Sequence, residues 1–131
     1  MNLAFALNTY NQAKVAAEAT KYDGHEAVKY ALDQVVGSMQ KLNEGLNPEE
    51  KEHYFERALS SIYFLQKCLD FEKGGDIANN LFQLYEYGRQ QLLSDLKEGK
   101  PAGTYQAIDF LSEIRDAWEE IGKKNDEDGR N

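Results

Sequence analysis

Residues 47–75, NPEEKEHYFERALSSIYFLQKCLDFEKGG, contain the clearest helix signal in the chain. Asn47 suits a helix cap, Pro48 suits the first helical position, and the two glutamates that follow face the positive end of the helix. Apolar residues then recur every three or four positions, at Tyr54, Ala58, Ile62, Leu65 and Leu69. This spacing predicts one amphipathic helix that ends at Gly74-Gly75, after Lys73.

Three further amphipathic helices are predicted around this one. Asp23-Gly24-His25-Glu26 has the form of a capping box, and the apolar stripe after it ends near Asn43: Val28, Ala31, Leu32, Val35, Met39 and Leu42. Asp76 opens a third helix, which Gly99 stops, with the stripe Ile77, Leu81, Leu84, Tyr85, Gly88 and Leu92. A fourth helix begins at Pro101 or Thr104 and closes at Gly122, with the stripe Ala107, Leu111, Ile114, Trp118 and Ile121.

Four amphipathic helices joined by short connections predict an all-α fold, an antiparallel up-down-up-down four-helix bundle. A chain of 131 residues is long enough for one domain, which we expect to span residues 1–122. Residues 1–22 carry few large apolar groups, so we expect them to form a weakly held N-terminal arm. Residues 123–131 are polar and are predicted to form a disordered tail.

The composition narrows the range of partners. The net charge of -8 argues against nucleic acid and anionic membranes, which both favour a basic surface. The chain has no run of apolar residues long enough for a transmembrane helix, and its start does not resemble a signal peptide. A single cysteine, Cys68, excludes a disulfide framework and a cysteine-built zinc site. These observations favour a cytoplasmic domain.

Two helices carry more apolar side chains than one core-facing stripe needs. The third has a second stripe at Ala78, Phe82, Leu93 and Leu96. The second has Phe64, Cys68 and Phe71 on a separate face, and Phe55, Leu59 and Tyr63 on the other side of its main stripe. Contact with two neighbouring helices would explain this surplus. The alternative is an apolar groove open to a partner helix.

No catalytic set emerges from the sequence. Glu50 and His53 match the Glu-x-x-His motif of di-iron proteins, but that site needs a second copy, and Tyr22 stands three positions before His25. A lone helical cysteine such as Cys68 is usually a small buried apolar residue. We therefore expect no enzyme activity, no cofactor and no metal. A helical metal or redox enzyme using His53 and Glu50 is the alternative that metal analysis would test.

The segment from Ala58 to Leu96 resembles the FliS family of flagellin export chaperones. The likeness is carried by Leu69-Asp70, Gly74-Gly75, Ile77-Ala78, Asn80-Leu81 and Leu84-Tyr85-Glu86-Tyr87, then by the run from Leu111 through Ile114-Arg115 and Ala117-Trp118 to Ile121. Tyr10 is similar to the tyrosine of that family's N-terminal arm. The first helix departs from the pattern, because Gly24 stands near the usual proline and Leu32-Asp33-Gln34-Val35 replaces a Leu-Tyr-Asp-Gly-Ala run.

The resemblance implies a cytoplasmic, non-enzymatic chaperone that binds the disordered C-terminal segment of flagellin. Binding would prevent premature polymerisation and deliver flagellin to the flagellar type III export apparatus, and a co-chaperone is a further partner. We expect flagellin to contact Tyr10, Phe64, Phe71, Ile77, Phe82, Leu84, Tyr85 and Tyr87. We expect Gly74, Gly75 and Trp118 to be structural. The alternative function is a generic dimerising adaptor that self-associates through Phe64, Cys68 and Phe71.

Overall fold

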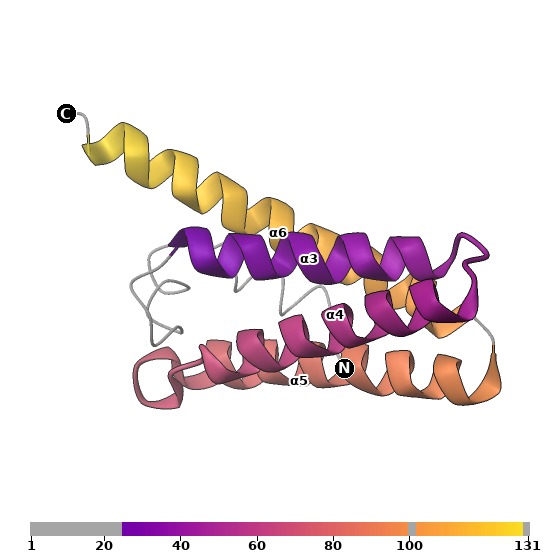
Figure 1. The fold of residues 1–131 in the computed structure, drawn as a ribbon. Coiled ribbons are helices and arrows are strands. Elements are labelled where there is room, and N and C mark those ends of the chain that lie inside the picture. The colour runs from indigo at the N-terminus through magenta and orange to yellow at the C-terminus, as the bar shows by residue number, and fades with distance from the viewer. Residues whose placement is uncertain (1–24, 100–101, 130–131) are drawn as a thin grey trace.

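Four helices make up the computed structural model, which describes residues 25–99 and 102–129. They are α3 (His25–Leu42), α4 (Pro48–Lys67), α5 (Phe71–Glu98) and α6 (Ala102–Gly129). Each helix packs antiparallel to the next, and α6 returns to lie beside α3 (Figure 1). The predicted all-α up-down-up-down bundle is therefore confirmed. The predicted arm, residues 1–22, lies outside the described residues.

The connection between α3 and α4 follows the sequence prediction. α3 ends at Leu42, and Gly45 turns the chain with a φ of +67°. Asn47 then caps α4, because its Oδ1 accepts a hydrogen bond of 2.9 Å from the Glu50 N–H. Pro48 occupies the first turn, where its missing N–H costs nothing.

The connection between α4 and α5 differs from the prediction. α4 ends at Lys67 and α5 begins at Phe71, so the prediction of one helix through to Lys73 was wrong. The reason is Asp70, whose carboxylate accepts hydrogen bonds from the N–H groups of Glu72 and Lys73, at 3.1 and 3.0 Å, and so caps a new helix. Gly75 kinks this helix instead of ending the previous one. Its φ of 49° and ψ of -123° are readily adopted only by glycine.

The end of α6 also extends further than predicted. We expected the helix to close at Gly122 and residues 123–131 to form a disordered tail, but α6 continues to Gly129. An interior glycine costs a helix only about 1 kcal/mol relative to alanine, and the lysines and glutamate that follow are good helix formers. The last turns of α6 project beyond the other helices (Figure 1).

The core is built from the predicted stripes. In α3, the small side chains of Ala31 and Ser38 are buried and lie seven residues apart, on the same side of the helix, and Ala58 of α4 is buried too. Small side chains at a contact allow two helix axes to approach closely, which fits the extensive packing of α3 against α4. The largest fully buried side chains come from all four helices and, at Leu69, from the α4–α5 connection: Leu32, Met39, Ile62, Leu65, Leu69, Leu84, Leu92, Leu111 and Ile114.

Candidate partner-binding surface

Two rows of side chains line the outer edge between α4 and α5, and we call them together the α4–α5 seam. The α5 row advances in steps of four and three residues and contains Phe82, Glu86, Arg89, Leu93 and Leu96. The α4 row contains Phe55, Leu59, Tyr63 and Gln66. The rows face each other, because Gln66 hydrogen bonds to Glu86 and Phe55 shares a pocket with Leu96. The seam therefore places the surplus apolar residues of both helices along one line.

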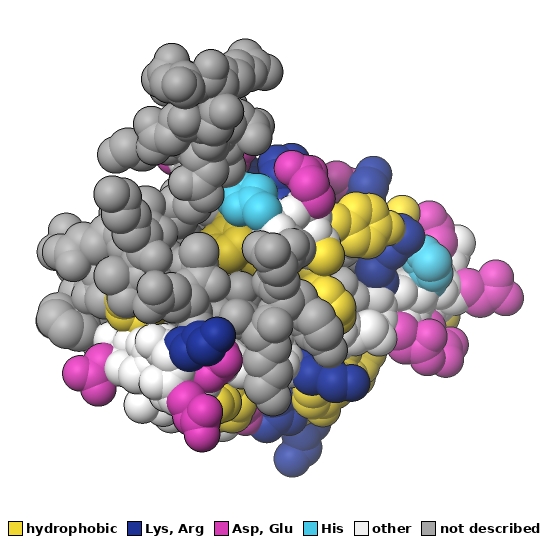
Figure 2. All heavy atoms as spheres, turned by 90° about the vertical axis from the view of Figure 1, so that its left-hand side faces the viewer, with side chains coloured by type: hydrophobic (Ala, Val, Ile, Leu, Met, Phe, Trp, Pro, Cys, Tyr) yellow, Lys and Arg dark blue, Asp and Glu magenta, His cyan; other side chains and the backbone are white. Residues whose placement is uncertain are grey.

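One end of the seam is aromatic. Phe71, the first residue of α5, packs edge-on against Phe82 with ring centroids 6.0 Å apart. The contact covers only part of the ring, since Phe71 remains 47% exposed. Figure 2 faces the end of the bundle where α4 meets α5, and it shows apolar side chains at the surface between acidic and basic ones. This end offers aromatic surface to a partner.

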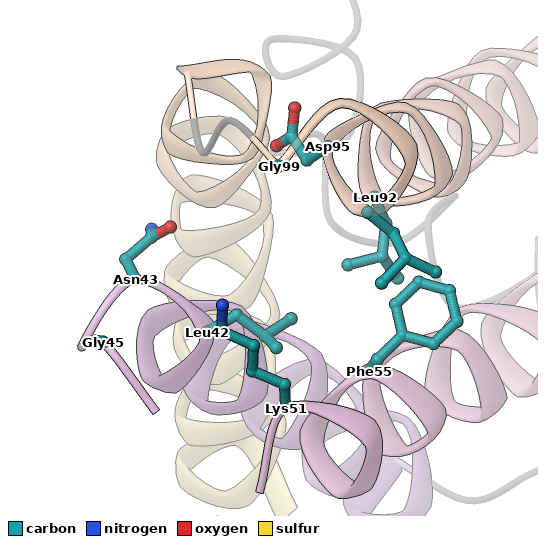
Figure 3. A pocket seen from close by; sticks show the side chains of 9 residues that line it. Leu42, Asn43, Gly45, Lys51, Phe55, Leu92, Asp95 and Gly99 are labelled. Atoms are coloured by element: carbon teal, nitrogen blue, oxygen red, sulfur yellow. The ribbon is translucent and has the colours of Figure 1, made fainter. Parts of the chain in front are cut away.

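The opposite end of the seam is hollow. A pocket of about 280 Å³ lies where the α3–α4 connection meets the end of α5. The side chains of Leu42, Phe55 and Leu92 converge on it from three helices (Figure 3). Leu96 lines the same pocket and is 59% exposed. Phe82 and Leu96, which mark the two apolar ends on α5, are about 21 Å apart at 1.5 Å per helical residue.

The middle of the seam is polar. Gln66 Nε2 donates to Glu86 Oε2 at 2.9 Å, and Arg89 Nε donates to both Glu86 oxygens at 3.0 Å. These hydrogen bonds, above all those from Arg89, lower the pKa of Glu86 from its usual value of 4.5 to about 2. The Glu86 carboxylate thus stays charged across the physiological range and joins the two helices.

The predicted flagellin-contacting residues divide between surface and core. Phe64 and Phe71 are exposed and Phe82 is half-buried, so a partner can reach all three. Three others lie in the core, where they support the seam from beneath: Ile77, Leu84 and Tyr85. Tyr10 lies outside the described residues.

Tyr87, also predicted to contact flagellin, faces α6. Its ring packs on Phe110 with centroids 5.5 Å apart, and its hydroxyl donates to Gln106 Oε1 at 2.8 Å. The ring is half-buried by these contacts. Tyr87 thus lies on the opposite side of α5 from the α4–α5 seam.

The predicted separate face of Phe64, Cys68 and Phe71 does not exist as one surface. Cys68 caps the end of α4 and is only 1% exposed, whereas Phe71 belongs to the next helix. Burial also raises the pKa of the Cys68 thiol, which disfavours the reactive thiolate. The sequence prediction grouped these three residues because it assumed one continuous helix. Asp70 interrupts that helix by capping the start of α5.

Sequence reasoning missed several exposed residues. Tyr63 is 50% exposed and Leu93 is 38% exposed, and both lie on the seam. The signal for Leu93 and Leu96 was present, because both belong to the second stripe of the third predicted helix. Tyr30 and Tyr105 are also exposed, and no periodic pattern singled them out.

The residues predicted to be structural have identifiable contacts. Trp118 stacks on His25 with ring centroids 4.7 Å apart and an interplanar angle of 7°. Its Nε1 donates a hydrogen bond of 2.8 Å to the His25 carbonyl oxygen, which ties the start of α3 to α6. Gly74 is buried in the first turn of α5, and Gly75 forms the kink described above.

The described residues provide no support for a metal centre. His53 is exposed, and its ring lies edge-on to Tyr54, 5.0 Å away between centroids. Among the residues whose side chains the structure describes, no three or more histidine, cysteine, aspartate or glutamate side chains are grouped as metal ligands would be. In the same part of the chain, no helix combines the length and apolar character that crossing a membrane requires.

These features define the class of protein: a helical bundle that presents a partly exposed apolar seam, as binding proteins do. Comparison with known proteins gives the family. The family model described as "Flagellar protein FliS" matches residues 6–125. The chain therefore belongs to the FliS family, which is a family of chaperones and not of enzymes.

Curated relatives extend over nearly the whole chain. The flagellar secretion chaperone FliS of Vibrio cholerae is 28% identical over 120 residues, which cover 88% of each chain. The protein of the same name from Salmonella typhimurium is 27% identical over 128 residues and covers 95% of each chain. The flagellar secretion chaperone FliSB of Pseudomonas aeruginosa is 25% identical over 126 residues, covering 88% of this chain and 94% of the relative.

Proposed function

We propose that this chain is a cytoplasmic flagellar secretion chaperone whose client is the disordered C-terminal segment of flagellin. In this proposal the chaperone prevents premature polymerisation of flagellin and delivers it to the flagellar type III export apparatus. Membership of the FliS family supports the chaperone role. The observation that carries the choice of site is the α4–α5 seam, with its aromatic end at Phe71 and its hollow end at Leu96.

The seam suits an amphipathic helical client. An apolar face on a client helix would cover the exposed rings at one end and fill the pocket of about 280 Å³ at the other. Subunits that polymerise through such a face cannot do so while the chaperone covers it. Capture by a single bundle therefore competes directly with filament assembly and needs no catalytic step.

The thermodynamics of such binding are distinctive. A disordered client loses conformational entropy when it orders, which offsets part of the gain from apolar contact. We therefore expect moderate affinity together with a negative heat-capacity change, the robust sign of apolar burial.

Calorimetry tests this proposal directly. The purified chain is titrated at several temperatures with the C-terminal segment of a flagellin from the same source, and with that flagellin lacking the segment as control. The proposal predicts one-to-one binding to the segment, a negative heat-capacity change and no binding to the truncated flagellin. No binding at tens of micromolar would contradict it, because that limit is generous for coupled folding and binding.

A measurement of mass against protein concentration separates the chaperone from a dimerising adaptor. An adaptor that uses the outer surface of α4 would gain mass with concentration in the absence of flagellin, and Phe64→Asp would return it to a monomer. The chaperone proposal predicts instead that the unliganded mass does not change with concentration over the range used for calorimetry.

A further inference from the structure

The polar centre of the α4–α5 seam is a hydrogen-bond network that joins the two helices. Glu86 accepts hydrogen bonds from Gln66 Nε2 at 2.9 Å, from Arg89 Nε to both of its oxygens, and from Arg89 Nη2. These four contacts match the roughly four lone-pair sites of an ionised carboxylate, so Glu86 is satisfied within the chain. The Glu86 and Arg89 side chains are part-buried, 21% and 24% exposed.

Gln66 and Arg89 keep hydrogen-bonding capacity beyond these contacts. A guanidinium has five N–H groups, and Glu86 engages those of Nε and Nη2. Gln66 donates to Glu86 through Nε2, and its Oε1 is an acceptor. Both side chains bond the same carboxylate, so they lie side by side at the surface of the seam. A partner therefore meets a donor and an acceptor close together, between two apolar ends.

The chemistry of the centre favours a neutral amide over other side chains. A client carboxylate would approach the Glu86 charge, and a client ammonium or guanidinium would approach Arg89. An apolar client side chain would cover the donor and the acceptor without bonding to them, which costs free energy. A carboxamide fits both, because its oxygen accepts from Arg89 while its NH2 group donates to Gln66.

We propose that the polar centre of the α4–α5 seam recognises one asparagine or glutamine side chain of the client and thereby fixes the register of the client helix. This inference rests on the proposed function and names a chemical requirement of the same site. The client it fits is an amphipathic helix whose apolar face is interrupted once by a carboxamide.

The spacing along α5 makes such a register specific. Measured from the midpoint of Glu86 and Arg89, Phe82 and Leu96 lie about 8 and 13 Å away, at 1.5 Å per residue. A client helix shifted by one turn, about 5.4 Å, would place an apolar side chain over the polar centre. A buried polar side chain that fixes one register, at a cost in stability, is well documented for coiled coils.

A brace that only joins α4 to α5 is the competing account. The Gln66–Glu86 hydrogen bond links the two helices in the free chain as well. A brace acts on the stability of the bundle and is indifferent to the side chains of the client. Replacing such a network by apolar side chains of similar volume is often neutral or stabilising for the fold. The two accounts therefore differ in client binding and not in folding.

Substitutions in the client, paired with a chaperone variant, test the proposal. The probe is the flagellin C-terminal segment, in which each asparagine is replaced in turn by leucine and each glutamine by methionine, with affinity measured by calorimetry. The wild-type chain should bind one of these segments about tenfold more weakly, because its donor and acceptor are then covered and unpaired. The triple variant Gln66→Leu, Glu86→Leu, Arg89→Met should bind that same segment at least as tightly as the unsubstituted one.

Two results would overturn the inference: no amide substitution weakens binding to the wild type, or the one that does weakens binding to the triple variant equally. Circular dichroism and thermal unfolding show whether the triple variant is folded. If it is not, Gln66→Met takes its place, because this change removes the acceptor and leaves the Glu86–Arg89 pair intact. The loss on amide substitution should then fall to about threefold or less, and an undiminished tenfold loss would overturn the inference.

A further control separates this inference from the proposed function. Phe71→Asp places a charge at the aromatic end of the seam without touching the polar centre. Binding that is weakened by Phe71→Asp but insensitive to every amide substitution would overturn the amide contact alone. A wild-type chain that does not bind the unsubstituted segment would overturn both.

Discussion

The α4–α5 seam can be compared with the edge where Lys29 and Asp33 of α3 meet Arg115 of α6, which we call the α3–α6 seam. Each seam joins two antiparallel helices, yet the side chains along their outer edges differ in chemistry. Between α3 and α6 the outer row is charged: Lys29 Nζ lies 3.3 Å from Asp33 Oδ2, and Arg115 Nε lies 3.9 Å from Asp33 Oδ1. In the two rows of the α4–α5 seam the charged side chains lie at the centre and the ends are apolar, although Lys51 and Asp95 also line the pocket at one end. A partner at the first seam would have to remove water from paired charges, whereas a partner at the second covers exposed apolar groups.

One aromatic residue at each seam shows the same contrast in exposure. Trp118 is 2% exposed and makes both a ring stack and a hydrogen bond with His25. Phe71 packs edge-on against Phe82 and keeps nearly half of its surface exposed. Trp118 is therefore covered by its contacts within the chain, whereas Phe71 at the α4–α5 seam stays partly exposed.

Trp118→Ala should have the largest effect on folding. Removal of a large buried aromatic side chain usually costs about 3–5 kcal/mol of unfolding free energy, from lost burial and the cavity left behind. Chemical denaturation of the wild type and the variant measures this cost. A loss below about 1 kcal/mol would show that the α3–α6 seam is not closed by this residue.

Gly75→Ala should have an intermediate effect. A Cβ at this position has no neighbour within 4 Å, so the cost comes from the backbone, whose φ of +49° disfavours side chains. Residues held in such conformations typically cost about 1–3 kcal/mol. Gly88→Ala is the matched control, because Gly88 lies within a regular stretch of α5 and its Cβ would meet Leu111 at an ordinary 3.6 Å. Equal losses in both variants would contradict the role of the kink.

The stabilisation that the Glu86 charge provides should be lost only in acid. The folded pKa of about 2 is lower than the usual value of 4.5, so the stabilisation is fully present above pH 4.5 and disappears as the pH falls through 2. Melting temperatures of the wild type and Glu86→Gln, measured from pH 6 down to 2, should therefore converge at the acid end. A difference that persists unchanged at pH 2 would contradict the lowered pKa.

Asp33→Ala should have the smallest effect. Its ion pairs with Lys29 and Arg115 are partly exposed, with the Asp33 side chain 42% exposed. Surface ion pairs of this kind contribute about 0–1 kcal/mol. Thermal unfolding at low and high salt measures this contribution. A loss comparable to that of Trp118→Ala would mean that charge, and not the buried aromatic contact, holds the α3–α6 seam.

Periodicity predicted the fold because it is a local property that survives small errors in helix boundaries. The stripe of the third predicted helix, from Ile77 to Leu92, is buried as expected, and the Asn47 cap has the expected hydrogen bond. The boundary at Asp70 was missed because an aspartate within an apolar run reads as a polar helical position as readily as a cap. Because of that one error, Phe71 was assigned to the second predicted helix, although it is the first residue of α5.

The surface was harder to predict than the core. A helical stripe shows which residues face the same way, but it does not show how far the neighbouring helix covers them. Leu92 and Leu96 lie on adjacent turns and line the same pocket, yet Leu92 is buried and Leu96 is 59% exposed. Leu84 and Tyr85 lie on the main stripe of the third predicted helix, yet they were counted among the flagellin contacts with the family resemblance, and both are core residues.

A matched pair of surface variants tests the α4–α5 seam most directly. Leu96→Asp places a charge at the pocket end of the seam, and Tyr30→Asp places one at an equally exposed position on α3, away from it: the two residues are 59% and 61% exposed. Calorimetry with the flagellin C-terminal segment should show affinity reduced at least tenfold by Leu96→Asp and unchanged by Tyr30→Asp. Equal losses in the two variants, or loss only in Tyr30→Asp, would show that the client binds elsewhere on the bundle.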